Sequence, residues 1–157
     1  MTQELLRLEF ERGGVLTARL LHDAASRTVE RVLAALPLEA MAYHSRWSGR
    51  EVNFPIRLGA RAPARENDTT SVGCGDVIYW REWEKGDDAA EALAFYYGAE
   101  VTRDHRGTLP VNVFARIPEA QWALAQQIGV RIWRNGGERV RVVSGKNQSE
   151  EQRQDRA

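Results

Sequence analysis

The chain has 157 residues, a length that suits one domain with a hydrophobic core of its own. Its hydrophobic fraction of 43% and charged fraction of 28% are typical of a soluble globular protein. Lysine plus arginine number 22, as do aspartate plus glutamate. The resulting zero net charge argues against a general nucleic-acid or membrane-surface binder, which would have an excess of basic residues.

Cysteine content and the N-terminus indicate the compartment. The single cysteine, Cys74, cannot form an internal disulfide or a cysteine-rich zinc site. The opening MTQELLRLEF lacks the charged start and apolar run of a signal peptide. No stretch approaches the ~18 apolar residues of a membrane-spanning helix. We therefore expect a cytoplasmic protein without membrane association.

The chain begins with two segments of period two. Apolar and charged residues alternate from Leu6 to Phe10, and alternation returns from Leu16 to Leu20. The glycine pair Gly13-Gly14 between them suits a tight turn, because glycine tolerates positive φ. An N-terminal β-hairpin is predicted.

Two segments have a helical period. After Ser26, apolar residues recur at i, i+3, i+4 and i+7, and Pro37 ends the pattern; these residues are Val29, Val32, Leu33 and Leu36. A second helix opens at Pro118, although Gly129 is expected to weaken or break it. Its predicted buried stripe is Trp122, Ala125, Ile128 and Ile132.

Further strands complete a mainly β protein. They are predicted at 43–47, 51–58, 76–80, the second half of 89–98, 111–116, and around Val140 and Val142. Pro55 marks an edge, bulge or early end, because proline donates no hydrogen bond. Polar loops are predicted at 59–71, 81–88 and 100–110. About eight short strands with two helices predict a closed barrel over residues 1–143, and the polar residues 144–157 predict a disordered tail.

Several motifs resemble known barrels. LTARLLHDAASRTVERVLAAL (16–36) resembles the opening strand and helix of cyclophilins. RWSGREVNF (46–54), GDVIYW (75–80) and PVNVFARI (110–117) together resemble the bacterial and archaeal cyclophilin-like proteins of uncharacterised function called TM1367-like or DUF3830. The resemblance covers roughly Leu5 to Val143. It implies a closed eight-stranded cyclophilin-like β-barrel with two capping helices, and no known reaction.

The sequence departs from true cyclophilins at their catalytic strand, which pairs an arginine with a downstream Phe-Met-x-Gln. Arg46 can occupy the place of that arginine, and Phe54 lies near the place of the phenylalanine. No glutamine follows, and Asn53 is the closest amide. The resemblance therefore implies the barrel more strongly than prolyl isomerase activity.

Arg46 and Glu51 are the charged candidates for a binding site. A guanidinium at Arg46 can grip a carboxylate or a peptide-like carbonyl, and the alternative is an ion pair with Glu51 across a turn. Glu51 can act as a general base if burial raises its pKa. The alternative for Glu51 is a plain ion pair with Arg46 or Arg50.

The aromatic and amide candidates lie on predicted strands. Tyr79 and Trp80 must point to opposite faces, and we assign Tyr79 to the pocket wall, with barrel packing as the alternative. Asn112 and Phe114 share a face, whereas the opposite face (Val111, Val113 and Ala115) is the better candidate for core. A mixed amide and aromatic face suits a ligand groove, and an exposed strand face is the alternative.

Cys74 and the histidines give little support for other chemistry. Cys74 lies in a glycine turn, and a reactive thiolate there would need a nearby base. The three histidines, His22, His44 and His105, form no metal-ligand motif. No metal and no cofactor is predicted.

Three functional hypotheses remain open. In the first, a groove binds a small molecule or short peptide group, and its ligand-binding residues are Arg46, Glu51, Phe54, Tyr79, Asn112 and Phe114. In the second, the protein is an enzyme, either a weak prolyl isomerase or an amide-acting protein like the cyclophilin-like domains of allophanate-hydrolase-type proteins. In the third, the segment Trp80–Trp83 mediates a homo-oligomer.

Overall fold

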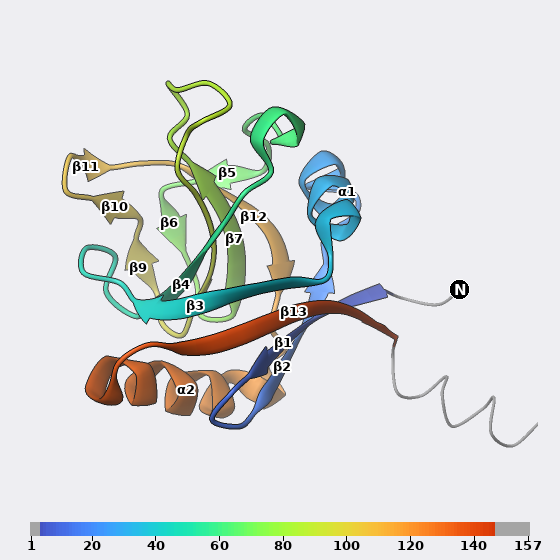
Figure 1. Ribbon diagram of the computed structural model, residues 1–157. Coiled ribbons are helices and arrows are strands. Elements are labelled where there is room, and N and C mark those ends of the chain that lie inside the picture. The colour runs from blue at the N-terminus through green and yellow to red at the C-terminus, as the bar shows by residue number, and fades with distance from the viewer. Residues whose placement is uncertain (1–3, 147–157) are drawn as a thin grey trace, which may run out of the picture.

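The computed structural model describes residues 4–146 and has at its centre a closed antiparallel barrel (Figure 1). Neighbouring strands run in the order β2-β1-β13-β3-β4-β8-β7-β12, and β12 pairs back onto β2. The predicted eight-stranded fold is confirmed. The strands are β1 (Glu4–Phe10), β2 (Val15–Leu20), β3 (Leu38–His44), β4 (Glu51–Ile56), β7 (Asp76–Arg81), β8 (Glu91–Tyr96), β12 (Val111–Arg116) and β13 (Glu138–Lys146).

Two α-helices cover openings of the barrel. In Figure 1, α1 (Ser26–Ala35) lies at the upper right and α2 (Trp122–Asn135) lies beneath β13. Two short 3-10 helices, η1 (Gly59–Arg61) and η2 (Glu119–Gln121), are also present. Both α-helices contribute to one interior cluster, α1 through Val29 and Val32 and α2 through Ala125, Ile128 and Ile132. Within residues 4–146, neither helix is long and apolar enough to cross a membrane.

Gly129 does not break α2, which continues without interruption to Asn135. A Cβ at this position would lie 2.2 Å from Cε1 of Tyr97. The glycine therefore allows the Tyr97 ring to pack directly against the helix backbone. Trp122, predicted in the buried stripe, is instead 36% exposed. Its indole nitrogen donates to the carbonyl oxygen of Ile117 at 2.9 Å.

Two strand boundaries differ from the prediction. β3 begins at Leu38 and ends at His44, so Arg46 lies in the following loop. β3 pairs with β4 only at Tyr43–Asn53 and His44–Val52. The later half of β4 therefore has no β3 partner, which explains why it tolerates Pro55.

β13 extends beyond the predicted end of the barrel domain at residue 143. It runs to Lys146 and pairs with the beginning of β1. Residues 144–146, predicted as the start of a tail, thus belong to the last strand. The rest of the predicted tail, 147–157, lies outside the described residues.

The predicted polar loops contain short strands. β6 (Ser71–Val72) pairs with β9 (Glu100–Val101), and β10 (Arg103–Asp104) pairs with β11 (Gly107–Thr108); β5 (Asp68–Thr69) pairs with β12. The 100–110 segment lies outside the barrel, at the left of β7 and β12 in Figure 1.

Two hydrophobic clusters result. The large one fills the barrel. The smaller one lies on the outer face and consists of Val72, Ile78, Ala94, Tyr96, Val111 and Val113, with Leu21, Trp80 and Leu109 packed against it. The sheet region β4-β8-β7-β12 is therefore covered on both faces, and the outer covering leaves room for a site.

A candidate ligand cavity on the outer face of the barrel

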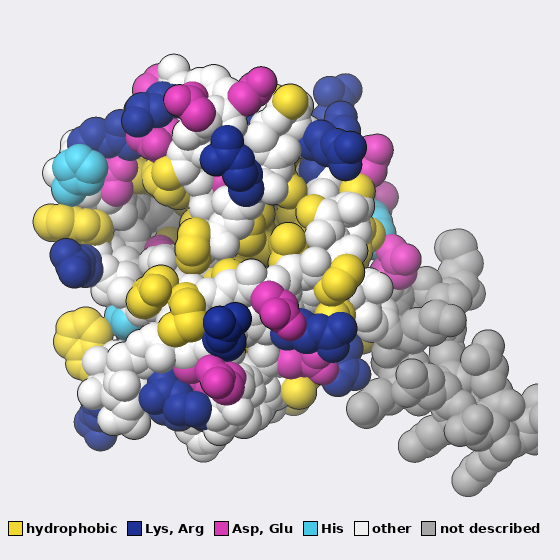
Figure 2. Space-filling model, viewed as in Figure 1, with side chains coloured by type: hydrophobic (Ala, Val, Ile, Leu, Met, Phe, Trp, Pro, Cys, Tyr) yellow, Lys and Arg dark blue, Asp and Glu magenta, His cyan; other side chains and the backbone are white. Residues whose placement is uncertain are grey.

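A cavity of about 670 Å³ lies on the outer face of β4, β8 and β7. Its walls come from the end of β3 with the 45–50 loop, from the 102–109 segment, and from the C-terminal end of α2. Figure 2 shows a hollow at the left of the molecule, between the β10–β11 hairpin above and β3 with α2 below.

Small side chains on β8 make the space. Successive strand residues face opposite sides, so Leu93 and Phe95 fill the barrel while Ala92 and Ala94 face the cavity. Ala94 lies opposite Asn53 of β4 in the register, and Asn53 also faces the cavity. Methyl groups at these positions leave unfilled volume above the sheet.

A buried carboxyl group lies in the wall of this cavity. Glu51 is 8% exposed. Its Oε1 accepts a hydrogen bond from Nδ2 of Asn53 at 3.0 Å, and its Oε2 accepts one from the Tyr96 hydroxyl. Burial raises the pKa of Glu51, while hydrogen bonds from Tyr96, Asn53 and Ser48 act in the opposite direction.

Tyr96 is held as the protonated partner of that carboxyl group. Burial, and then the charge of Glu51, raise the pKa of the Tyr96 hydroxyl. Tyr96 is 1% exposed and lies directly opposite Glu51 in the β4–β8 register. These effects favour the protonated phenol, whose O–H donates a hydrogen bond to the carboxyl group of Glu51.

The 45–50 loop is held in place by serine hydroxyls. Ser45 Oγ accepts from the backbone nitrogens of Trp47 (3.1 Å) and Ser48 (2.9 Å). Ser48 Oγ accepts from the nitrogen of Arg103 (2.9 Å) and donates to its carbonyl oxygen (2.8 Å). These bonds tie the loop after β3 to β10 and close one end of the cavity.

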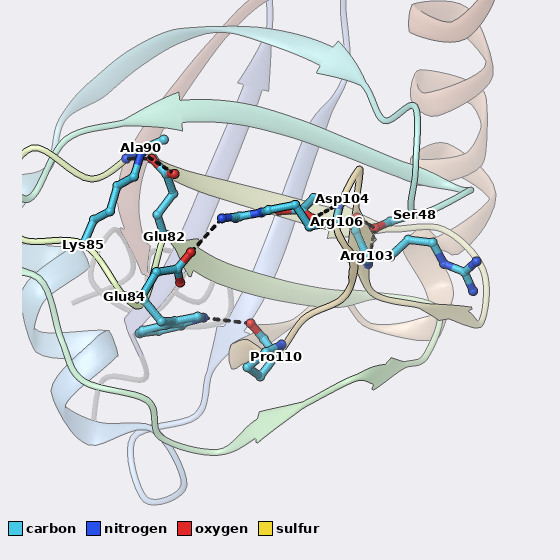
Figure 3. A network of polar contacts seen from close by, with 10 residues as sticks. Ser48, Glu82, Glu84, Lys85, Ala90, Arg103, Asp104, Arg106 and Pro110 are labelled. Carbon is cyan, nitrogen blue, oxygen red and sulfur yellow. Dashed lines mark hydrogen bonds and ion pairs between the residues drawn. The ribbon is translucent and has the colours of Figure 1, made fainter.

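A charged network holds the opposite wall. In Figure 3, Arg106 lies between Glu84 and Asp104, with Nη1 at 2.7 Å from Glu84 Oε1 and Nη2 at 2.8 Å from Asp104 Oδ2. The indole nitrogen of Trp83 donates to the carbonyl oxygen of Pro110 at 2.9 Å. The β10–β11 hairpin is thereby anchored to the 82–90 segment, and Asp104, which lines the cavity, is already paired.

His44 has a defined place at the cavity. Its Nδ1 lies 3.1 Å from the carbonyl oxygen of Ser45, and its Nε2 lies 2.5 Å from the Tyr97 hydroxyl. Because a carbonyl oxygen only accepts, Nδ1 carries a proton, and in the neutral ring Nε2 accepts from Tyr97. The ring packs edge-on against Trp133, with centroids 4.9 Å apart.

Exposed aromatic side chains surround the mouth. Tyr43 is 50% exposed, Trp47 is 53% exposed and Trp133 is 66% exposed, and all three line the cavity. Trp47 also approaches His105, with ring centroids 6.5 Å apart. The sequence interpretation overlooked these three as site residues. For Trp47 a signal was available, because it is a large aromatic residue in the otherwise polar segment 44–51.

Of the six residues predicted to bind ligand, the structure brings two to the cavity, Arg46 and Glu51. Phe54, Tyr79 and Phe114 are fully buried inside the barrel. The Tyr79 hydroxyl donates to Glu91 at 2.5 Å. The correction has a simple cause: on β4 and β7 the adjacent residues, Asn53, Ile78 and Trp80, face the cavity instead. A shift of one residue along a strand exchanges the two faces.

Asn112 is also corrected from cavity wall to structural residue. It is 0% exposed, and its Nδ2 donates to Thr28 Oγ1 (3.1 Å) and to the carbonyl oxygen of Ala64 (2.9 Å). Its Oδ1 accepts from the nitrogen of Glu66 at 3.0 Å. These bonds join β12 to α1 and the 64–66 segment. β8 and β7 lie between β12 and β4, so Asn112 and Arg46 do not converge.

β12 itself shows which face is the core. We predicted Val111, Val113 and Ala115 on the core face, but the first two belong to the outer cluster. The register shifts between Val113 and Ala115, which marks a bulge. Phe114 and Ala115 consequently both contribute to the interior cluster.

The ion pairs predicted for Glu51 are not formed. Within residues 4–146, no ion pair joins Glu51 to Arg46 or to Arg50. Arg50 instead pairs with Glu100, at 2.7 Å between Nε and Oε1. Arg46 is exposed at the cavity mouth.

The structure does not support a reactive thiolate, a metal site or an exposed aromatic patch at the remaining residues considered from the sequence. Cys74 is partly buried, and burial raises its pKa, which disfavours the thiolate. No group of three or more His, Cys, Asp or Glu side chains suited to a metal ion occurs within the described residues. Trp80 and Trp83 are both partly buried, so the Trp80–Trp83 segment is not an exposed aromatic patch. A homo-oligomer stays a prediction, which light scattering can test.

Comparisons with solved structures identify the architecture. The structure of McbB in complex with tryptophan aligns with a TM-score of 0.69 at 20% identity, over 88% of this chain and 44% of that one. The chain thus spans less than half of the McbB chain. The hypothetical protein AF2241 from Archaeoglobus fulgidus aligns with a TM-score of 0.56 at 24% identity, over 90% and 94% of the two chains. The Mimivirus cyclophilin gives 0.52 at 10% identity, over 95% and 92%.

Sequence comparison supplies the family. No curated protein matches the chain. The family model described as "Protein of unknown function (DUF3830)" matches residues 9–144. That range spans the barrel from the end of β1 into β13 and includes the whole cavity. The chain therefore belongs to the DUF3830 family, and its fold is the cyclophilin-like barrel.

Proposed function

We propose that the protein binds a small molecule in the outer-face cavity. The observation that carries this proposal is a buried carboxyl group, Glu51, in the wall of a partly enclosed hollow of about 670 Å³. Small-molecule sites commonly have volumes of about 300–1,000 Å³, mostly apolar walls and a few orienting polar groups. Ile78, Ala92 and Val111 supply an apolar floor here, and Asn53 adds an amide.

Two further features support a ligand with a flat apolar part. The aromatic side chains at the mouth offer ring faces and edges that are not used by the barrel core. A structural neighbour, McbB, is described in complex with tryptophan, which is a small molecule of this kind. A short peptide group with an aromatic side chain has the same chemistry.

A thermal-shift screen against a metabolite library tests the proposal. Ala92→Phe places a ring in the cavity from a partly exposed position, whereas Ala90→Phe adds the same ring at an exposed position outside it. We expect ligands that raise the melting temperature of the wild-type protein and of Ala90→Phe, but not of Ala92→Phe. Ligands that stabilise both variants equally, or no ligand at all, would contradict a binding cavity.

A second candidate function is amide-acting catalysis, favoured by the burial of Glu51 next to Tyr96. A carboxyl group with a raised pKa can exchange a proton with a bound amide. The measurement is ammonia release from a panel of small amides, with Glu51→Gln as the inactive control. Equal rates for the two proteins would remove this candidate.

Prolyl isomerisation has less support. Asn53, the amide nearest to the missing glutamine, already donates to Glu51. A proline-peptide assay at high protein concentration gives a separate test, and a rate at background is expected.

A further inference from the structure

Buried glutamates in this protein are usually compensated, and Glu138 is the clearest case. It is 2% exposed, and its Oε1 lies 3.3 Å from Nε of Arg12 and 2.8 Å from Nε of Arg131. Its Oε2 accepts from the backbone nitrogen of Arg12 at 2.8 Å. Two guanidinium groups therefore neutralise the charge of Glu138, as a buried carboxylate requires.

Glu91 is compensated by the backbone. It is 4% exposed, and its Oε2 accepts from the nitrogens of Leu58 (2.8 Å) and Gly59 (3.0 Å). Its other oxygen accepts from Tyr79. Glu91 does not line the outer-face cavity, so its hydrogen bonds serve the fold.

Glu51, like Glu91, has only neutral donors, but it differs from both other glutamates because it faces the cavity. Within residues 4–146 it forms no ion pair with lysine or arginine. The nearby His44 already uses both ring nitrogens, toward Ser45 and Tyr97. A cationic group that enters the cavity would supply the missing counter-charge.

Positive charge is available at the same end of the cavity. Arg46 and Arg103 are exposed and line the cavity, and neither guanidinium forms an ion pair within the described residues. The Ser48 hydroxyl bonds to both backbone groups of Arg103 and lines the same cavity as Glu51. The same cavity is therefore lined by one buried acidic side chain, two exposed basic side chains and an apolar floor.

We propose that the ligand is a free α-amino acid with an apolar or aromatic side chain. Its ammonium group binds Glu51, and its carboxylate binds Arg46 and Arg103. Its side chain lies over the apolar floor of Ile78, Ala92 and Val111. This inference rests on the proposed binding function and narrows it to one ligand class. A peptide end carries only one of the two charges, so the free amino acid matches the site better.

Isothermal titration with L-phenylalanine and two truncated analogues tests the assignment. Phenethylamine lacks the carboxylate, and 3-phenylpropionate lacks the ammonium group. We expect the amino acid to bind at least about ten-fold more tightly than either analogue, since each loses one charge-assisted contact. L-Tryptophan and L-leucine, titrated in parallel, report the preferred side chain.

Two variants assign the charges. Glu51→Gln should lower the affinity for L-phenylalanine about ten-fold. The variant should then bind L-phenylalanine no more tightly than 3-phenylpropionate. The double variant Arg46→Gln/Arg103→Gln should bind L-phenylalanine no more tightly than phenethylamine. Glu30→Gln and Arg31→Gln, on the exposed face of α1, are the matched controls and should leave all affinities unchanged. Circular dichroism verifies that each variant is folded.

The outcomes separate this inference from the broader proposal. Equal affinities for L-phenylalanine and both analogues, or unchanged binding by Glu51→Gln, would overturn the amino-acid assignment. So would the absence of binding by all three amino acids when the library screen yields other ligands that Ala92→Phe blocks. That last result would leave the cavity proposal intact.

Discussion

The inner and outer faces of the barrel wall beside the cavity differ most in side-chain size on β8. Facing the barrel interior, β4, β8 and β12 carry Phe54, Phe95 and Phe114, all 0% exposed. Facing outward, β8 carries Ala92 and Ala94. The inner face is filled by rings at these positions, whereas the outer face of β8 carries methyl groups beside a hollow that is also lined by polar, charged and aromatic side chains. Where a sheet is covered on both faces, this difference in size indicates which face is the site.

The comparison implies a division of effects between the two faces. Truncation of an inner residue leaves a cavity in a packed core and lowers the free energy of unfolding. Truncation of a residue at the cavity mouth removes contacts with solvent or ligand and leaves the core intact. The predictions below test this division.

The largest effect is expected for Phe114→Ala on the inner face. Phe114 is fully buried in the interior cluster, so the variant should lose about 3–5 kcal/mol of unfolding free energy. Urea denaturation measures the change. The control is Leu109→Ala, because Leu109 is only partly buried where it packs against the outer cluster. This variant should lose clearly less unfolding free energy. A loss below about 1 kcal/mol for Phe114→Ala would place the ring outside a packed core.

The next effect concerns Gly129 in α2, where the helix meets Tyr97 beside the cavity. The helix propensity of alanine is about 1 kcal/mol more favourable than that of glycine. However, the Cβ of an alanine at position 129 would lie 2.2 Å from the Tyr97 ring. Overpacking of this kind costs about 1–3 kcal/mol, so we expect a net loss of up to about 2 kcal/mol for Gly129→Ala. The exposed position Gln126→Ala is the control. A more stable Gly129→Ala variant would show that Tyr97 moves freely.

Sequence periodicity predicted most of the barrel strands and both α-helices, and the motif resemblance indicated the cyclophilin-like arrangement. The alternation from Leu6 to Phe10 predicted β1, and the run Val111 to Arg116 predicted β12 with its boundaries. The stripe Val29 and Val32 predicted α1. These signals are local, because each depends on which residues share a face of one element.

The site was harder because period two does not say which face is inward. Glu51 was identified from its charge within a strand, and the structure places it at the cavity. Tyr79 was preferred over its neighbour Trp80, although Trp80 is the one that lines the cavity. On β12 the bulge after Val113 changes the alternation, and no local signal announces it. The three exposed aromatic residues at the cavity mouth come from β3, the 45–50 loop and α2, which are brought together only by the tertiary fold.

A smaller effect, with a defined pH dependence, is expected for Glu51→Gln. Burial raises the pKa of Glu51 in the folded protein above its ordinary value of 4.5. The folded state therefore binds the proton more tightly than the unfolded state, and wild-type stability falls as the pH rises through the raised pKa. The glutamine side chain of the variant does not titrate, so the stability of the variant relative to wild type should increase with pH above 4.5.

Urea denaturation of both proteins between about pH 4 and pH 9 measures this difference. Groups elsewhere, such as Glu100 and Asp104 with their lowered pKa values, titrate in both proteins and cancel in the difference. Tyr96 and His44 face Glu51, and a parallel series with His44→Gln separates the contribution of the imidazole. A difference independent of pH would mean that Glu51 is not perturbed by burial.

The smallest effect on stability is expected for Trp133→Ala on the rim. Trp133 is 66% exposed, so the free energy of unfolding should change by no more than about 0.5 kcal/mol. If the rim contacts the ligand, the same variant should weaken binding several-fold, since aromatic side chains supply much of the contact area in binding sites. Trp122→Ala, on the same helix but outside the cavity, should do the reverse, because its indole bonds to Ile117. Thermal unfolding measures the stability of each variant, and titration measures its affinity for the ligand. A Trp133→Ala variant that loses stability without losing affinity would assign its ring to the fold, and the contrast between the two faces would then end at the rim.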